Sequence, residues 1–147
     1  MDRAEKVKEY FLSGYNCSQA VFMAFCDLTE LDKEKAAKIS APFGGGMGRM
    51  REVCGAVSGM LMVFGALYGN TDPSDRNAKH EHYKTVQELA DKFKERSGSI
   101  ICREILKNPS SDPSPTPRSE SFYKERPCVQ MVVTAAEILD EYIKNHG

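Results

Sequence analysis

The residues of this chain with the widest chemical range are its cysteines, which are Cys17, Cys26, Cys54, Cys102 and Cys128. A deprotonated cysteine is both a metal ligand and a nucleophile toward disulfides. In a reducing compartment, spaced cysteines are metal ligands, redox thiols or plain core residues more often than structural disulfides. No pair has the C-x-x-C spacing, so the chain contains neither a thioredoxin-like motif nor a zinc ribbon.

Four of these cysteines are predicted to lie at helix N-termini, namely Cys17, Cys54, Cys102 and Cys128. The free backbone N–H groups and the helix dipole at such positions favour negative charge and lower a thiol pKa. Basic residues close in sequence would add to this effect; they are Arg51, Arg103 and Arg126. We therefore expect four thiols of lowered pKa at one redox or metal site. Plain burial of core cysteines is the alternative explanation of the pattern.

Cys26 is the exception among the five cysteines. It follows Cys17 by nine residues, which places it about 180° around the same predicted helix. The two side chains cannot face one site from one helix, so we expect Cys26 to be a buried core thiol.

The spacing of apolar residues is helical along nearly the whole chain and predicts an all-α fold. We expect a compact single-domain bundle of about five to seven helices over residues 1–147. The predicted helices cover 2–13, 16–28, 32–39, 52–68, 75–96 and 100–106, and a last one opens at Pro127. The Pro- and Ser-rich segment 108–121 should be an extended, mobile surface loop, for which a tolerated excursion is a simpler explanation than a lid.

Glycines surround the second of the four cysteines. Gly55 and Gly59 lie four apart on one predicted helix face, where each costs roughly 1 kcal/mol relative to alanine. Tight helix packing explains Gly59, whereas Gly55, directly after Cys54, fits better with room for a cofactor around the sulfur. The glycine-rich segment 44–48 lacks the ending of a P-loop and is predicted to be a tight connection that brings backbone close to the cysteines.

These cysteines and glycines together resemble the C_GCAxxG_C_C family, which is named for suspected redox activity. The resemblance rests on residues 16–20 (Asn-Cys-Ser-Gln-Ala), on 54–59 (Cys-Gly-Ala-Val-Ser-Gly), on Cys102 and Cys128, and on the glycine-rich 43–48. It spans nearly the whole chain. It implies a redox role for the four cysteines, and some larger electron-transfer proteins carry a similar module with an iron–sulfur cluster. It implies no particular reaction or substrate.

Three kinds of site stay open for the four cysteines. The preferred one is an iron–sulfur cluster of the two-iron type, ligated by all four and used for electron transfer or sensing. The second is a metal-free thiol–disulfide redox protein, in which Cys17 or Cys54 attacks and another of the four resolves. The third is a structural zinc site in a helical interaction module, against which stands the lack of close-spaced ligand pairs.

Composition limits the partners and the compartment that we expect. The net charge of −1 offers no cationic surplus for nucleic acid or an anionic membrane. The longest uncharged stretch, 53–71, is too short in its apolar part to span a bilayer. The charged N-terminus lacks an apolar signal core, so we expect a cytoplasmic protein. Its expected partner is an unidentified redox protein. The apolar helices over 16–28 and 52–68 could also form the interface of a homodimer.

Overall fold

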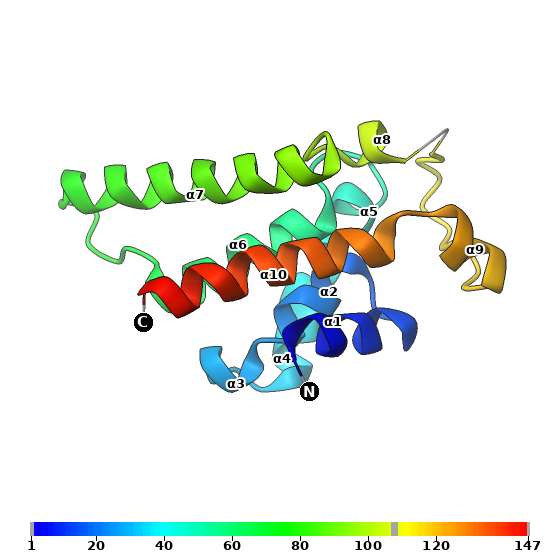
Figure 1. Ribbon diagram of the computed structural model, residues 1–147, viewed down its shortest axis with the longest axis horizontal. Helices are drawn as coiled ribbons and strands as arrows, with labels where there is room; N and C mark the ends of the chain where they lie inside the picture. The colour runs from blue at the N-terminus through cyan, green and yellow to red at the C-terminus, as the bar shows by residue number, and fades with distance from the viewer. Residues whose placement is uncertain (1, 107–108, 147) are drawn as a thin grey trace.

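The computed structural model describes residues 2–106 and 109–146, and its helices are drawn in Figure 1. In chain order they are α1 (Arg3–Leu12), α2 (Cys17–Met23), α3 (Cys26–Thr29), α4 (Lys33–Ser40), the 3₁₀ turn η1 (Ala41–Phe43), α5 (Gly44–Met47), α6 (Gly55–Tyr68), α7 (Arg76–Ser97), α8 (Cys102–Ile105), α9 (Glu120–Glu125) and α10 (Cys128–His146). Six of them have seven residues or more. Over the described residues the β pairing is limited to an isolated bridge between Val53 and Ile101. The predicted all-α fold is confirmed.

The core forms where α2 lies against α6 and where α10 packs on α1, α2, α6 and α7. Figure 1 shows α7 and α10 running side by side along the length of the molecule. Gly59 lets α2 and α6 approach closely, because a Cβ atom at this position would lie 2.7 Å from the Ser18 carbonyl oxygen. The packing explanation of Gly59 is therefore confirmed.

The start of α2 follows the capping signal in its sequence. The Asn16 side chain accepts a hydrogen bond from Gln19 N at 2.9 Å, and the Gln19 side chain accepts one from Asn16 N at 3.0 Å. This reciprocal capping box satisfies two backbone donors at the helix N-terminus. It determines where α2 begins, and therefore where Cys17, its first residue, is placed.

The helix predicted over 16–28 is interrupted at residues 24–25. α2 ends at Met23, and Phe25 leaves helical geometry with φ −112° and ψ 15° before α3 begins. Arg3 explains this break, because its Nη1 donates to the Ala24 carbonyl at 2.7 Å and its guanidinium lies 4.7 Å from the centre of the Phe25 ring. Cys26 thus lies on a separate short helix. It is buried in the core, as predicted.

The apolar helix predicted over 52–68 begins at Gly55 instead, and Cys54 is its N-cap rather than a first-turn residue. The reason is a backbone pairing between remote segments. Cys54 N donates to Ile100 O at 2.7 Å, and Cys102 N donates to Glu52 O at 2.6 Å, which keeps residues 52–54 extended. Across the described ranges 2–106 and 109–146, none of the helices has both the length and the apolar character needed to cross a bilayer.

The Pro- and Ser-rich segment predicted as a loop over 108–121 is extended from 109 to 119, and α9 begins at Glu120. Asn108 lies outside the described residues. The segment lies at the surface, as expected, but two arginines also tie it down across the cysteines. Arg49 Nε donates to Asp112 O at 2.7 Å, and Arg51 Nε donates to Ser110 O at 2.8 Å. Backbone carbonyls are present in every residue, so the sequence carried no sign of these contacts.

Candidate four-cysteine redox site

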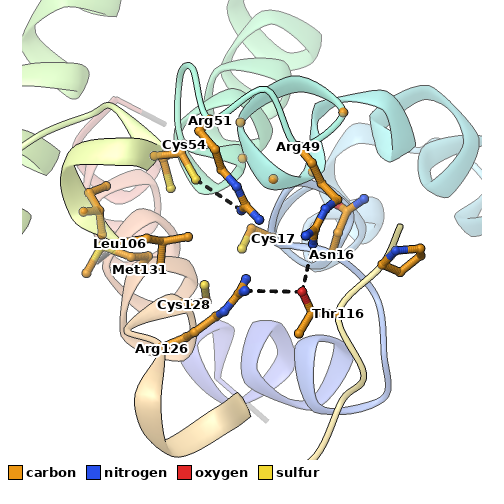
Figure 2. A pocket seen from close by; sticks show the side chains of 18 of the residues that line it. Asn16, Cys17, Arg49, Arg51, Cys54, Leu106, Thr116, Arg126, Cys128 and Met131 are labelled. Carbon is orange, nitrogen blue, oxygen red and sulfur yellow. Dashed lines mark hydrogen bonds between the residues drawn. The ribbon is translucent and has the colours of Figure 1, made fainter. Parts of the chain in front are cut away.

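A cavity of about 470 Å³ lies at the end of the bundle where several helices begin. Four cysteines line it: Cys17 opens α2, Cys54 caps α6, Cys102 opens α8 and Cys128 opens α10. Figure 2 shows Cys17, Cys54 and Cys128 around this space. Gly55 lines the cavity as well, and Cys26 does not. The structure thus brings together the four cysteines that the sequence placed at helix starts.

Cys17 and Cys128 form a first pair, since the interaction between their side chains is the largest cause of the pKa shift of each thiol. The contact between α2 and α10 holds them together. Asn16 Nδ2 also donates to Ala41 O at 3.1 Å, which ties the first turn of α2 to the turn that precedes the glycine-rich segment. A Cβ atom at Gly44 would collide with the Asn16 side chain, so glycine is needed for this approach.

Cys54 and Cys102 form a second pair, on the two segments joined by the Val53–Ile101 bridge. Both thiols are buried, with 6% and 8% of their surface exposed. Gly55 brings this pair toward the first one, because a Cβ atom at Gly55 would lie 3.2 Å from Cys17 Cβ. The space that Gly55 leaves is therefore occupied by the first turn of α2.

The glycine-rich segment wraps the cavity in a left-handed turn. Positive φ angles occur at Gly45 (67°), Gly46 (68°), Met47 (67°), Gly48 (57°), Arg49 (68°) and Arg51 (62°). A left-handed conformation costs roughly 1–2 kcal/mol for each residue other than glycine, so the surrounding structure must hold this backbone in place. The predicted close approach to the cysteines is confirmed, because a Cβ atom at Gly46 would lie 2.8 Å from Cys102 Cβ.

Four arginines line the cavity beside the cysteines, namely Arg49, Arg51, Arg118 and Arg126. Among the described residues that form its wall there is no aspartate or glutamate. Figure 2 shows Arg49 and Arg126 meeting at Thr116, whose Oγ1 accepts from them at 3.0 and 3.3 Å. Desolvation, together with the nearby charges of Arg51 and Arg126, lowers the pKa of Arg49. The wall is therefore strongly cationic.

The sequence identified only part of this arginine set. Arg51 and Arg126 lie by the thiols as predicted, but Arg103 turns to Glu52, with 3.1 Å between Nη1 and the carboxylate. Arg49 was not predicted to lie near the thiols, although its position directly after the glycine-rich segment 44–48 could have indicated this. Arg118 comes from the extended segment, and nothing in its sequence context indicated the cavity.

The prediction that all four thiols have lowered pKa values is wrong for three of them. The hydrogen bond to Cys128 and burial raise the pKa of Cys17 well above its usual value. Burial raises the pKa of Cys54 to about 12 and also raises that of Cys102. Backbone N–H groups at the start of α6 act on the Cys54 pKa in the predicted direction, but desolvation is the larger effect.

Cys128 alone follows the prediction, with a pKa lowered to about 7. The main cause is the hydrogen bond from Cys17, which stabilises the Cys128 thiolate, and the positive charges of Arg126 and Arg118 add to it. One thiol of the pair is therefore ionised near neutral pH while its partner keeps its proton.

The four cysteines are arranged as two pairs rather than as one compact cluster. All five cysteines of the chain are free thiols. Within the described part of the chain, no three or more His, Cys, Asp or Glu side chains gather closely enough to hold a metal ion. This arrangement does not support the tetrahedral zinc site that the sequence left open.

Residues 15–142 match the family described as "Putative redox-active protein (C_GCAxxG_C_C)". The chain belongs to this family. The matched region contains all four cysteines of the cavity and the glycine-rich turn, so the resemblance seen in the sequence motifs is confirmed. No curated protein matches the chain, and no solved structure matches it either. Family membership establishes a cysteine-based redox class and names no cofactor.

Proposed function

We propose that this chain is an electron carrier or sensor whose four cysteines hold an iron–sulfur cluster of the two-iron type. The observation that carries the proposal is the arrangement of four cysteines as two pairs around one cavity. A two-iron cluster takes four cysteine ligands, two on each iron. The donor set therefore fits this group better than it fits a single ion.

The charge of the cavity wall supports the same proposal. Four thiolates around iron and sulfide make an anionic unit, and four arginines face the cavity without a lining carboxylate among the described residues. The starts of the long helices α6 and α10 add partial positive charge. When bound, the cluster would supply the acceptance and release of one electron. The chain's own residues would hold it, shield it from water and offset its charge.

The proposal is tested by purifying the protein without oxygen and measuring its visible spectrum with its iron, sulfide and zinc content. We expect broad visible absorption and equal amounts of iron and sulfide. A colourless protein without iron would refute the cluster, and stoichiometric zinc would point back to a structural site. The proposal also includes a homodimer and a redox partner protein. The oligomeric state can be measured on the same sample.

A second candidate function is thiol–disulfide exchange, which is favoured by the opposite pKa shifts of the neighbouring thiols Cys17 and Cys128. The Cys128 thiolate would attack one sulfur of a partner disulfide and release the other sulfur as a thiol. Cys17 would then displace the partner's remaining sulfur and form a Cys17–Cys128 disulfide. Two electrons pass to the partner, which leaves as two thiols after taking one proton from Cys17 and one from solvent.

The pH dependence of alkylation tests this second function on metal-free protein. With a pKa of about 7, half of Cys128 is thiolate at pH 7, whereas Cys54, with a pKa of about 12, is almost wholly protonated. Iodoacetamide should label Cys128 at least about tenfold faster than Cys54 at pH 7. The Cys128 rate should rise with pH and level off above pH 8, as measured by peptide mass spectrometry.

Cys17→Ala provides the matched variant for this measurement. It removes the hydrogen bond that stabilises the Cys128 thiolate, so the midpoint of the Cys128 labelling curve should move to higher pH. Equal, slow labelling of all cysteines below pH 8 in the wild type would rule out an exchange role for this pair.

A further inference from the structure

Arg51 is a buried cation with an unused donor in the four-cysteine cavity. Its side chain is held at two points, since Nε donates to Ser110 O at 2.8 Å and Nη1 donates to Cys102 Sγ at 3.7 Å. Only 4% of the residue is exposed. Its remaining nitrogen, Nη2, is buried and has no hydrogen-bond partner among the described residues. A buried charged donor without a partner is strongly unfavourable, so Nη2 points to a missing acceptor.

The surroundings of Arg51 define the charge of that acceptor. Arg49 and Arg126 line the same cavity, and the charges of Arg51 and Arg126 already lower the pKa of Arg49. In the described side chains, none of these three arginines has a carboxylate within ion-pair distance. The Cys128 thiolate and the Asp112 carboxylate offset part of this positive charge, but neither accepts a hydrogen bond from Arg51 Nη2, and the guanidinium groups still repel one another. The missing acceptor is therefore negatively charged.

The size and walls of the cavity define the class of ligand. A volume of about 470 Å³ lies within the range of small-molecule sites, roughly 300–1,000 Å³. Part of the wall is apolar, with Ile105, Leu106 and Met131 among its residues. Guanidinium groups present paired N–H donors that match the oxygens of carboxylates and phosphates. Figure 2 shows Arg49, Arg51 and Arg126 directed into this space from two segments, since Arg49 and Arg51 follow the glycine-rich turn and Arg126 caps the C-terminus of α9.

We propose that this cavity binds a small oxygen-bearing anion beside the cysteines, with Arg51 as its anchor and Arg49 and Arg126 as flanking donors. The anion site adds a ligand to the proposed redox function. It rests on that function only in that both use the same cavity. It would place an anionic substrate or effector next to the thiols. A small molecule, as well as a partner protein, could then exchange electrons with the site or regulate its electron transfer.

The test is calorimetric titration of the full chain, purified without oxygen, at constant ionic strength set with chloride so that general screening is held fixed. Phosphate and sulfate form one arm and acetate and citrate the other, which separates tetrahedral oxyanions from carboxylates. At least one arm should give saturable binding. Arg51→Gln should weaken that binding roughly tenfold to a hundredfold, and Arg51→Lys should restore only part of it because an ammonium lacks the paired donors.

Arg96→Gln is the matched control, because Arg96 pairs with Glu137 on the surface and does not line the cavity. It should bind as the wild type does. Arg49→Gln is the second site variant, and it should also weaken binding if Arg51→Gln fails to fold. Absence of saturable binding in both arms, or unchanged affinity in the folded Arg51 or Arg49 variants, would overturn the anion site. Absence of iron would overturn the proposed cluster instead, so the two failures are distinguishable.

Discussion

Cys54→Ser is expected to abolish the visible absorption of protein purified without oxygen and to reduce its iron and sulfide content at least about tenfold. Cys54 is one of the four proposed ligands: it is buried, it caps α6, and the Val53–Ile101 bridge joins its segment to that of Cys102. Serine replaces the thiolate ligand with a hydroxyl that stays protonated near neutral pH. The measurement is the visible spectrum together with iron and sulfide analysis.

The substitution is well suited to this test because it should not unfold the protein. Cys54 makes no side-chain capping hydrogen bond, whereas serine is among the preferred N-cap residues. The α-helical circular dichroism should therefore be retained. Cys26→Ala is the matched control, since it removes a buried thiol outside the cavity and should keep colour and iron. Loss of colour in both variants, or in neither, would contradict the assignment of the site.

Phe11→Ala should lower the free energy of unfolding by about 3–5 kcal/mol, a large share of the total for a domain of this size. Phe11 is 1% exposed, and its ring joins α1 to α9 and to the extended segment 109–119. Its centre lies 6.4 Å from the Phe122 ring and 5.9 Å from the Tyr123 ring, and the Arg118 guanidinium lies 4.5 Å from it. Removing the ring leaves a void and removes the aromatic and cation–π contacts at the same time.

Urea unfolding measures this change, with the midpoint shifting and the slope m unchanged. Tyr83→Ala is the control for loss of an aromatic ring at the surface, because Tyr83 is 58% exposed. It should change stability by no more than about 0.5 kcal/mol. A loss below about 1 kcal/mol for Phe11→Ala would mean that α1 is not coupled to α9 and segment 109–119 through this ring.

Local signals in the sequence were sufficient for most helix starts. Helix periodicity depends on residues three or four apart, and capping depends on side chains that contact backbone within one turn. Asn16 and Gln19 therefore predicted the start of α2 correctly, and Gly59 predicted a close helix contact. The end of α2 could not be predicted in this way, because Arg3 takes the Ala24 carbonyl from a remote position in the chain.

The sequence by itself determined the all-α class, the helix-start positions of Cys17, Cys54, Cys102 and Cys128, and the family to which the chain belongs. Only the tertiary structure decided how these thiols are paired and ionised. Burial outweighs the favourable helix-start field at Cys54, and a hydrogen bond from Cys17 makes Cys128 the one acidic thiol. Such effects act through space between segments far apart in the chain. For the same reason the arginines of the cavity, brought together from residues 49 to 126, could be recognised as one cationic wall only after the chain had folded.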